Sequence, residues 1–395
     1  MKIDDKTSHN SPSLRFPEFT GEWKEERLSE IADIYKGAGI SKDQLSDNGE
    51  PCILYGELYT KYKTETITEV ISRTDIDNTK LVRSKANDVI IPCSGETAED
   101  IATARCVIKD GILLGGDLNI IRLHNYDGSF VSYQLNGKRK YDIAKVAQGV
   151  SVVHLYGEHL KGVKTVNPCL AEQKKISRFL SLLDERIAVQ NRLIEDLKKF
   201  KCAIVEKMFK QSKANGRLGD FIEQVSVRNK NGLYSNVLSV SNKQGFVKQS
   251  EQFEDRTVAS EDTSNYKIVK RNNFAYNPAR INVGSIARLT KFDVGIVSPM
   301  YVCFRTKASI IPEYMEAFFT SQQFFYEMMK RLEGSVRLCL SYEGLCNIPV
   351  YIPDMNKQIA MGQNISLILS KIGLEIEYLG RLHQQKQYLL RKMFI

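Results

Sequence analysis

The sequence predicts an α+β protein with a twofold internal repeat, in which each of two globular domains is followed by a long helix. A constant offset of 185 residues aligns residues 149–209 with residues 334–394 without a gap. In the later part of both aligned segments, apolar residues recur at alternating spacings of three and four, which is the heptad pattern of packed helices. The upstream segments mix short β-rich runs with polar loops. Together these observations indicate two copies of one unit.

Length and composition set the outer limits of this interpretation. At 395 residues, of which 42% are hydrophobic and 26% charged, the chain has ordinary globular composition. The longest apolar runs are far shorter than the ~20 residues of a membrane-spanning helix. The N-terminus has no apolar secretory segment. The eight cysteines show no C-x-x-C spacing, so we expect reduced thiols in a cytoplasmic protein with neither a metal nor a redox site.

Identical residues recur along the aligned segments, and both copies close with the sequence Lys-Met-Phe at 207–209 and 392–394. The identical pairs include Gly149 and Gly334, Leu155 and Leu340, Leu160 and Leu345, Pro168 and Pro353, and Gln173 and Gln358.

The heptad pattern predicts two helices of about 35–38 residues, each roughly 55 Å long. The apolar seam of the first helix is Ile176, Leu180, Leu183, Ile187, Ile194, Leu197, Ile204 and Met208. The apolar seam of the second is Met361, Ile365, Ile368, Ile372, Leu379, Leu382, Leu389 and Met393. Polar residues interrupt the two seams at equivalent places, Gln190 with Glu375 and Lys201 with Lys386. A polar seam residue lowers stability but fixes register.

The net charge of +9 favours an acidic partner such as nucleic acid, although only mildly. The two helical segments, residues 172–212 and 356–395, each carry a net charge of +4 and so hold most of the excess. A solvated helix face is the ordinary explanation of such charge. The alternative explanation is that the positive charge contacts nucleic acid or an acidic partner surface.

The two globular halves share a frame and differ in their loops. Strands are predicted at 89–92, 111–114 and 120–123 in the first half, and at 273–276, 284–289 and 300–304 in the second. Residues 311–330 have helical spacing, with Phe318, Phe319, Phe324 and Phe325 expected in the core. The polar loops at 92–100 and 277–285 have different sequences. A common scaffold with different loops suits two related but unlike ligands.

Several catalytic motifs are missing from the sequence. There is no phosphate-binding G-x-x-x-x-G-K-[ST] loop, no G-x-G-x-x-G and no G-x-S-x-G. Residues 277–280, Asn-Pro-Ala-Arg, lack the aromatic residue with which amino-methyltransferases hold a flipped base. This pattern favours a binding protein over an enzyme.

The residues 170–187, with Glu206-Lys-Met-Phe209, resemble the central conserved region of type I restriction-modification specificity subunits. The opening Leu14-Arg-Phe-Pro-Glu-Phe, followed by Trp23 and Arg27-Leu28, is similar to the N-terminus of that family, as is Tyr55-Gly-Glu-Leu58. The resemblance implies four parts. These are a first target-recognition domain at 1–170, a central conserved helix at 171–212, a second target-recognition domain at 213–354 and a C-terminal conserved helix at 355–395.

The resemblance also implies a function. Each recognition domain reads one half of a bipartite, asymmetric DNA target. The helices pack as an antiparallel coiled coil that sets the gap and docks two modification (methyltransferase) subunits. Those subunits bind S-adenosylmethionine and methylate adenine N6, and two restriction subunits that use ATP and Mg²⁺ join for cleavage. The chain itself is implied to be non-catalytic and to bind no cofactor.

Candidate DNA-contacting residues are polar side chains in the loops of the two halves. In the first half they are Tyr59, Lys61, Ser94, Glu96, Thr97, Gln148 and Ser151; in the second they are Ser241, Lys243, Arg280, Asn282, Ser285, Ser335 and Arg337. Each has the alternative of being an ordinary solvent-exposed loop residue. Arg280 and Arg337 are the strongest candidates, because arginine pairs with guanine in a bidentate way.

Other functions remain open from the sequence. The chain could be a specificity subunit of another restriction class or a stand-alone DNA-binding protein, and co-purification with a methyltransferase subunit would discriminate. An adenine methyltransferase would bind S-adenosylmethionine. A coiled-coil scaffold without a nucleic-acid role would show no salt-dependent DNA binding.

Overall fold

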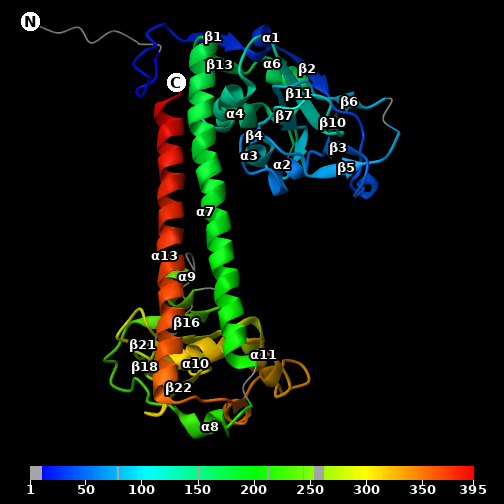
Figure 1. The fold of residues 1–395 in the computed structure, drawn as a ribbon. Helices are drawn as coiled ribbons and strands as arrows, with labels where there is room; N and C mark the ends of the chain where they lie inside the picture. Colours follow the sequence, from blue (N-terminus) through cyan, green and yellow to red (C-terminus); the bar gives the residue numbers. More distant parts are fainter. Residues whose placement is uncertain (1–10, 78–79, 150–151, 211–212, 243, 253–261) are drawn as a thin grey trace, which may run out of the picture. The chain divides into compact units, whose positions relative to one another are not determined.

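The computed structural model describes residues 11–77, 80–149, 152–210, 213–242, 244–252 and 262–395 (Figure 1). The chain divides into two compact units. The first unit comprises the chain up to Asn191 together with Tyr378–Ile395, and the second comprises Arg192–Glu377. Within the described ranges, no helix is both long enough and apolar enough to cross a membrane.

The first unit is built around a five-stranded sheet in the order β2-β11-β7-β9-β4. All five residues of β7 are buried, because its run of β-branched residues is covered on both faces. Neighbouring strands are antiparallel, except that β4 and β9 are parallel. The strand bounds are β2 (Ala32–Lys36), β4 (Thr66–Ile67), β7 (Asp88–Pro92), β9 (Arg105–Val107) and β11 (Leu118–Leu123).

Smaller sheets and short helices complete the first unit. A four-stranded sheet joins β5 (Ser72–Thr74), β3 (Glu50–Ile53), β10 (Leu113–Leu114) and β6 (Val82–Arg83), and two pairs join β1 (Lys24–Arg27) to β13 (Lys164–Asn167) and β8 (Ser94–Gly95) to β12 (Val153–His154). The helices are α1 (Leu28–Ile31), η1 (Lys42–Gln44), α2 (Glu57–Thr60), α3 (Ala98–Ile101), α4 (Gly128–Asn136), α5 (Lys140–Val146) and α6 (Gly157–Lys161). The buried ring of Trp23 packs against Phe130 and Phe394, so the end of the chain lies in this core.

The second unit repeats the scheme with two four-stranded sheets. One has the order β15-β22-β19-β20, the other β17-β16-β21-β18, and β14 pairs with β23. The strands are β14 (Gly216–Arg217), β15 (Ile222–Gln224), β16 (Val237–Ser241), β17 (Gly245–Lys248), β18 (Lys267–Lys270), β19 (Phe274–Tyr276), β20 (Ile286–Arg288), β21 (Val294–Val297), β22 (Val302–Thr306) and β23 (Pro349–Val350). The helices are α8 (Leu218–Phe221), α9 (Gln249–Gln252), η2 (Ile281–Val283), α10 (Pro312–Phe319), α11 (Gln322–Met329) and α12 (Tyr342–Cys346).

The aromatic segment of the second unit differs from the sequence prediction. Residues 311–330 form two helices rather than one, because Ser321 caps α11 by accepting a hydrogen bond from the Phe324 amide at 3.1 Å. Phe318, Phe319 and Phe324 are buried in the core as expected. Phe325 is 47% exposed, so its placement in the core was wrong: the break turns it away from the packed face.

Two long helices, α7 (Leu170–Lys210) and α13 (Met355–Lys392), extend through both units. All twenty predicted seam positions, including the four polar ones, are buried or half-buried. In the first unit Arg186 stacks on Tyr378 while Asp184 pairs with Lys386, so α7 and α13 run antiparallel there. In the second unit Ile204 and Met208 share a core with Met361 and Ile365.

A repeated glutamine joins each domain to its long helix. The Gln173 Oε1 atom accepts a hydrogen bond from the Asp127 amide at 2.9 Å, and its Nε2 donates to the Pro168 carbonyl at 2.8 Å. Gln358 makes the equivalent bonds at 3.0 Å to the Ile311 amide and to the Pro353 carbonyl. Asp127 and Ile311 are the N-cap residues of α4 and α10. The sequence repeat is therefore also a structural repeat.

Candidate nucleic-acid interface

Each unit brings a polar loop and a hairpin together at the end of a buried central strand. In the first unit the Leu155 amide donates to the Cys93 carbonyl at 2.8 Å, directly after β7. In the second unit the Leu340 amide donates to the Pro278 carbonyl at 3.1 Å, after β19. Both members of the second pair follow those of the first by the repeat offset. The two units therefore anchor their loops by the same backbone contact.

A glycine with positive φ opens each hairpin. Gly149 has φ +125° and Gly334 has φ +117°, values that L side chains rarely adopt. A Cβ atom at Gly149 would lie 2.1 Å from the Val152 carbonyl oxygen, and one at Gly334 would lie 2.4 Å from that of Arg337. The hairpins close through bridges between Gln148 and His154 and between Glu333 and Cys339. Both hairpins thus require glycine at this position, and both sequences have glycine there.

In the first unit, α2, β8, α3 and the hairpin surround a cleft of about 580 Å³. The Tyr59 hydroxyl donates to the Ser94 carbonyl at 3.0 Å across the cleft. Burial raises the pKa of Tyr59, with the charge of Asp100 adding to the effect, so the hydroxyl remains a donor. The cleft is lined by Tyr55, Gly56, Tyr59, Thr60, Ser94, Gly95, Glu96, Asp100 and Val152. We call this the first loop-and-hairpin surface.

In the second unit, the loop after β19 turns through η2 and ends at Gly284, which has φ +90°. A cleft of about 380 Å³ lies between η2 and α11 and has an apolar floor that includes Ile281, Phe324 and Met328. Arg280 at the start of η2 is exposed, as are Ser335, Val336 and Arg337 in the hairpin. Within the described part of the chain, neither the Arg280 nor the Arg337 guanidinium forms a hydrogen bond or ion pair. We call Arg280, Asn282 and residues 335–337 the second loop-and-hairpin surface.

Some of the first-half candidates lie together at the first cleft, and one of them lies apart from it. Tyr59, Ser94 and Glu96 line the cleft, and Gln148 is exposed at the base of the hairpin. Thr97 is the N-cap of α3, and its hydroxyl oxygen accepts from the Asp100 amide at 3.0 Å. Lys61 instead donates to Glu57 at 2.7 Å and to Ser72 at 2.6 Å, so it neutralises a buried carboxylate. Ser151 lies outside the described residues.

The second-half candidates divide in the same way. Arg280, Asn282, Ser335 and Arg337 lie on the loop and hairpin. Ser285 is 4% exposed and its hydroxyl donates to the Val240 carbonyl at 3.1 Å, so the side chain supports β16 and is not accessible to a ligand. Ser241 is half-buried at the end of β16. Lys243 lies outside the described residues.

Some lining residues were not among the sequence candidates. Tyr55, Asp100 and Val152 line the first cleft, and Val336 is 99% exposed at the tip of the second hairpin. The signal that could have found the hairpin residues is the identical pair Gly149 and Gly334, because in the second unit the exposed residues 335–337 follow Gly334 directly. Tyr55 and Asp100 are brought to the cleft by tertiary packing, which local sequence does not reveal.

The chemistry of both surfaces is that of binding. The first surface offers tyrosine rings and carboxylates, and the second offers guanidinium, amide and hydroxyl groups. Such groups contact base edges and phosphates in nucleic acids. No group of three or more His, Cys, Asp or Glu side chains that could hold a metal ion occurs among the residues placed by the structure.

Comparison with known proteins shows a family to which part of this chain is similar. Residues 20–199 match the family model described as the type I restriction modification DNA specificity domain. A curated relative, the type I restriction enzyme MjaVIII specificity subunit of Methanocaldococcus jannaschii, is 26% identical over 197 residues. That alignment covers 50% of this chain and 43% of the relative, so the matched part spans less than half of the relative's length.

Solved structures show the same fold over the whole chain. The S subunit of a type I restriction-modification system from M. genitalium superposes with a TM-score of 0.62 at 18% identity, covering 98% of this chain and 99% of that one. A structure described as bearing on assembly and conformational transition of the type I system superposes with a TM-score of 0.54 at 13% identity, covering 94% and 97%. The predicted fold class is confirmed.

The fold and the paired loop-and-hairpin surfaces define a duplicated α+β architecture with two long helices. Residues 20–199 are similar to the type I restriction-modification DNA specificity domain, and the resemblance predicted from the sequence is confirmed.

Proposed function

We propose that the chain is the non-catalytic DNA specificity subunit of a type I restriction-modification complex. Each loop-and-hairpin surface reads one half of a bipartite, asymmetric DNA target, and the helix pair sets the spacing between the halves. Phosphate contacts supply most of the affinity, and polar side chains on base edges supply the choice of sequence. Such a complex acts on DNA in the cytoplasm.

One observation carries this proposal: the same loop-and-hairpin construction occurs twice with unlike side chains. Gly95 in the first loop corresponds to Arg280 in the second, and Val152 in the first hairpin corresponds to Arg337 in the second. Arginine donates to guanine O6 and N7, whereas the Glu96 carboxylate accepts from an amino group such as cytosine N4. Two readers of different chemistry on one scaffold suit a target with two different halves.

The long helices also support docking of partner subunits. Helix α7 exposes Phe179, Leu182 and Val189 in the first unit, where an ordinary solvated helix would present polar side chains. In the same unit, α7 and α13 enclose a groove of about 310 Å³ lined in part by Phe179, Leu182, Tyr378 and Leu389. We propose that two modification subunits dock on the helix pair.

Cofactors belong to the partners in this proposal. The modification subunits bind S-adenosylmethionine, and two restriction subunits that use ATP and Mg²⁺ join the complex for cleavage. The present chain contributes double-stranded DNA recognition and assembly.

The test is a genome-wide map of N6-methyladenine in cells with and without this chain, in the presence of the candidate modification subunit. The expected result is a split, asymmetric motif that appears only with the chain. A variant carrying both Arg280→Ala and Arg337→Ala should alter one half of that motif and leave the other half intact. An unchanged map, together with purified chain that shows no sequence preference in binding, would overturn the proposal.

DNA binding and co-purification of the chain separate the alternative functions. Sequence-selective DNA binding without a co-purifying methyltransferase subunit would indicate a stand-alone DNA-binding protein. Co-purification with subunits of a different kind would indicate another restriction class.

A further inference from the structure

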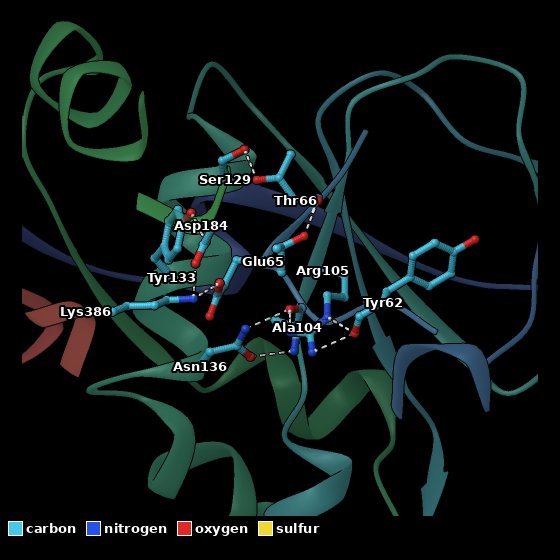
Figure 2. Close-up of polar contacts among 11 residues, drawn as sticks. Tyr62, Glu65, Thr66, Ala104, Arg105, Ser129, Tyr133, Asn136, Asp184 and Lys386 are labelled. Carbon is cyan, nitrogen blue, oxygen red and sulfur yellow. Dashed lines mark hydrogen bonds and ion pairs between the residues drawn. The ribbon is translucent and has the colours of Figure 1, made fainter. Parts of the chain in front are cut away.

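A buried ion cluster in the first unit lies between the helix pair and the recognition domain (Figure 2). The Lys386 Nζ atom, on α13, is 2.7 Å from Glu65 Oε2 and 2.6 Å from Asp184 Oδ1. The three side chains are only 15%, 10% and 7% exposed, respectively. The second oxygen of Asp184 accepts a hydrogen bond from the Tyr133 hydroxyl at 2.6 Å. The cluster thus joins α7, α13, α4 and the segment before β4.

The segments that follow the two walls of the first cleft meet beside this cluster. One wall is α2, from which the chain passes to Glu65 and β4. The other wall is the loop that ends at Ala104 and Arg105, where β9 begins. The Arg105 guanidinium donates to the Tyr62 carbonyl at 3.2 and 3.3 Å, and the Cys106 amide donates to the Glu65 carbonyl at 2.8 Å. The two walls are therefore bonded to each other beside the cluster.

Helix α4 is the support that the walls share with the helix pair, as Figure 2 shows. Asn136, its last residue, accepts from the Ala104 amide at 2.7 Å and donates to the Ala104 carbonyl at 2.9 Å. Ser129 accepts a hydrogen bond from the Thr66 hydroxyl at 2.9 Å. Tyr133, between them in sequence, bonds to Asp184 of α7. One helix therefore holds the segments that follow the two cleft walls, together with the ion cluster.

Stability alone does not explain a lysine at this seam position. Burying charges costs solvation, and well-packed apolar residues in place of a buried ion cluster are often equally or more stabilising. What a buried ion cluster adds is directional geometry, because each charge requires its partner at one place. Lys201 occupies the same seam position in the other copy, in the second unit. Its positive charge there acts to lower the pKa of Glu316, against the larger raising effect of burial. Lys201 therefore provides a matched comparison.

We infer that Lys386, Asp184 and Glu65 are positioning residues, which hold the first loop-and-hairpin surface on the helix pair in one orientation for DNA. None of the three lines the cleft. They act through α4, Ala104 and Arg105. The inference rests on the proposed DNA-reading function and assigns to these residues the accuracy with which the first surface reads its half of the target.

The decisive variant is Asp184→Asn in the full chain. The asparagine amide keeps the shape of the side chain and a hydrogen bond to Tyr133. It removes the negative charge that pairs with Lys386. Lys386→Arg retains the positive charge and is the conservative comparison. Lys201→Met removes the matched seam lysine from the second unit and is the control.

The measurement begins with a duplex selected by the wild-type chain from a random library. Competition binding then compares this duplex with versions that carry one base change in either half. For Asp184→Asn we expect discrimination against changes in the first half to fall by roughly tenfold, which is within the range that a single mismatch commands. Discrimination in the second half and the salt dependence of binding should stay at their wild-type values. Lys386→Arg should retain first-half discrimination, and so should Lys201→Met.

A second readout does not depend on DNA. Amide hydrogen exchange of the Asp184→Asn chain should be faster at residues 98–104 and unchanged at residues 279–285. Wild-type discrimination and wild-type exchange in Asp184→Asn would overturn the inference. A wild-type chain that selects no sequence would instead overturn the proposed function, and the exchange result would still decide whether the cluster holds the cleft.

Discussion

Lys386 and Asp184 form an ion pair of 2.6 Å between α13 and α7, within a seam that is otherwise mostly apolar. Glu65 adds a second carboxylate from the recognition domain at 2.7 Å. The seam lysine is therefore satisfied by one partner from the opposite helix and one from outside the helix pair. A polar seam residue fixes register most strongly when its partners exist at a single position along the helices.

Replacing Lys386 by methionine should destabilise the first unit. The substitution leaves the Asp184 and Glu65 carboxylates buried without their cation, and breaking a buried ion pair in this way typically costs about 3–5 kcal/mol. Chemical denaturation followed by circular dichroism gives the free energy of unfolding. Lys174→Met, at an exposed position of α7 in the same unit, is the control and should change it by less than about 0.5 kcal/mol. Equal stability of the two variants would contradict the role of the cluster.

The hairpin glycines should not tolerate alanine. Gly334→Ala places a Cβ against the Arg337 carbonyl in a backbone conformation that disfavours side chains, with an expected loss of about 1–3 kcal/mol. Gly380→Ala is the opposite control, because this residue lies in α13 with nothing within 4 Å of the new Cβ. Alanine there should stabilise the helix by about 0.5–1 kcal/mol. Thermal unfolding of both variants tests the sign of each effect.

The exposed arginines of the second surface should determine discrimination in one half of the target. Each of Arg280→Ala and Arg337→Ala is expected to reduce discrimination at its base pair by about 1–3 kcal/mol if it pairs with guanine. Arg271→Ala is a suitable control, because Arg271 is already paired with Asp293 at 2.8 Å. Competition binding with single-base changes measures the effect. Losses spread evenly over both halves would argue for phosphate contacts instead of base contacts.

Buried thiols should make the protein less stable at alkaline pH. Burial raises the pKa of Cys52 and that of Cys93 from 9.0 to about 11. A group whose folded pKa is raised contributes stability below its unfolded pKa, and that contribution is lost as pH rises from 9 through about 11. A Cys52→Ala/Cys93→Ala variant should therefore show a smaller decline of unfolding free energy between pH 9 and pH 11. An identical decline in both proteins would contradict the burial of these thiols.

Thiol labelling gives an independent check of the same burial. Cys169, just before α7, and Cys202, on α7, are exposed, whereas Cys52 and Cys93 are buried. At pH 8 an alkylating reagent should modify the exposed pair first, since the thiolate is the reactive form. Peptide mapping after brief labelling identifies the modified residues. Early modification of Cys93 would show that the base of the first loop opens readily.

The sequence predicted the features that repeat at short range, and it missed those made by distant residues. Heptad spacing located α7 and α13 to within a few residues at each end, because a long amphipathic pattern has few alternatives. The single-helix prediction at 311–330 failed because Ser321 provides a cap that overrides helical spacing. Glu65 lies 321 residues from Lys386, so no local pattern could pair them. The accessible candidates Arg280 and Arg337 lay in loops, whereas Ser285 sits where a strand begins and is covered by its neighbours.

The anchoring of each loop by main-chain atoms has an evolutionary consequence. The bonds from Leu155 to Cys93 and from Leu340 to Pro278 join main-chain amide and carbonyl groups. Every residue supplies a carbonyl whatever its side chain, and every residue except proline supplies an amide N–H. Exposed side chains near the anchors can therefore be exchanged with little effect on the frame that carries them. The two copies already illustrate this, because one scaffold carries Gly95 and Glu96 where the other carries Arg280 and Ile281. Such a design lets new preferences arise by substitution or by exchange of a whole segment, while the helix pair stays constant.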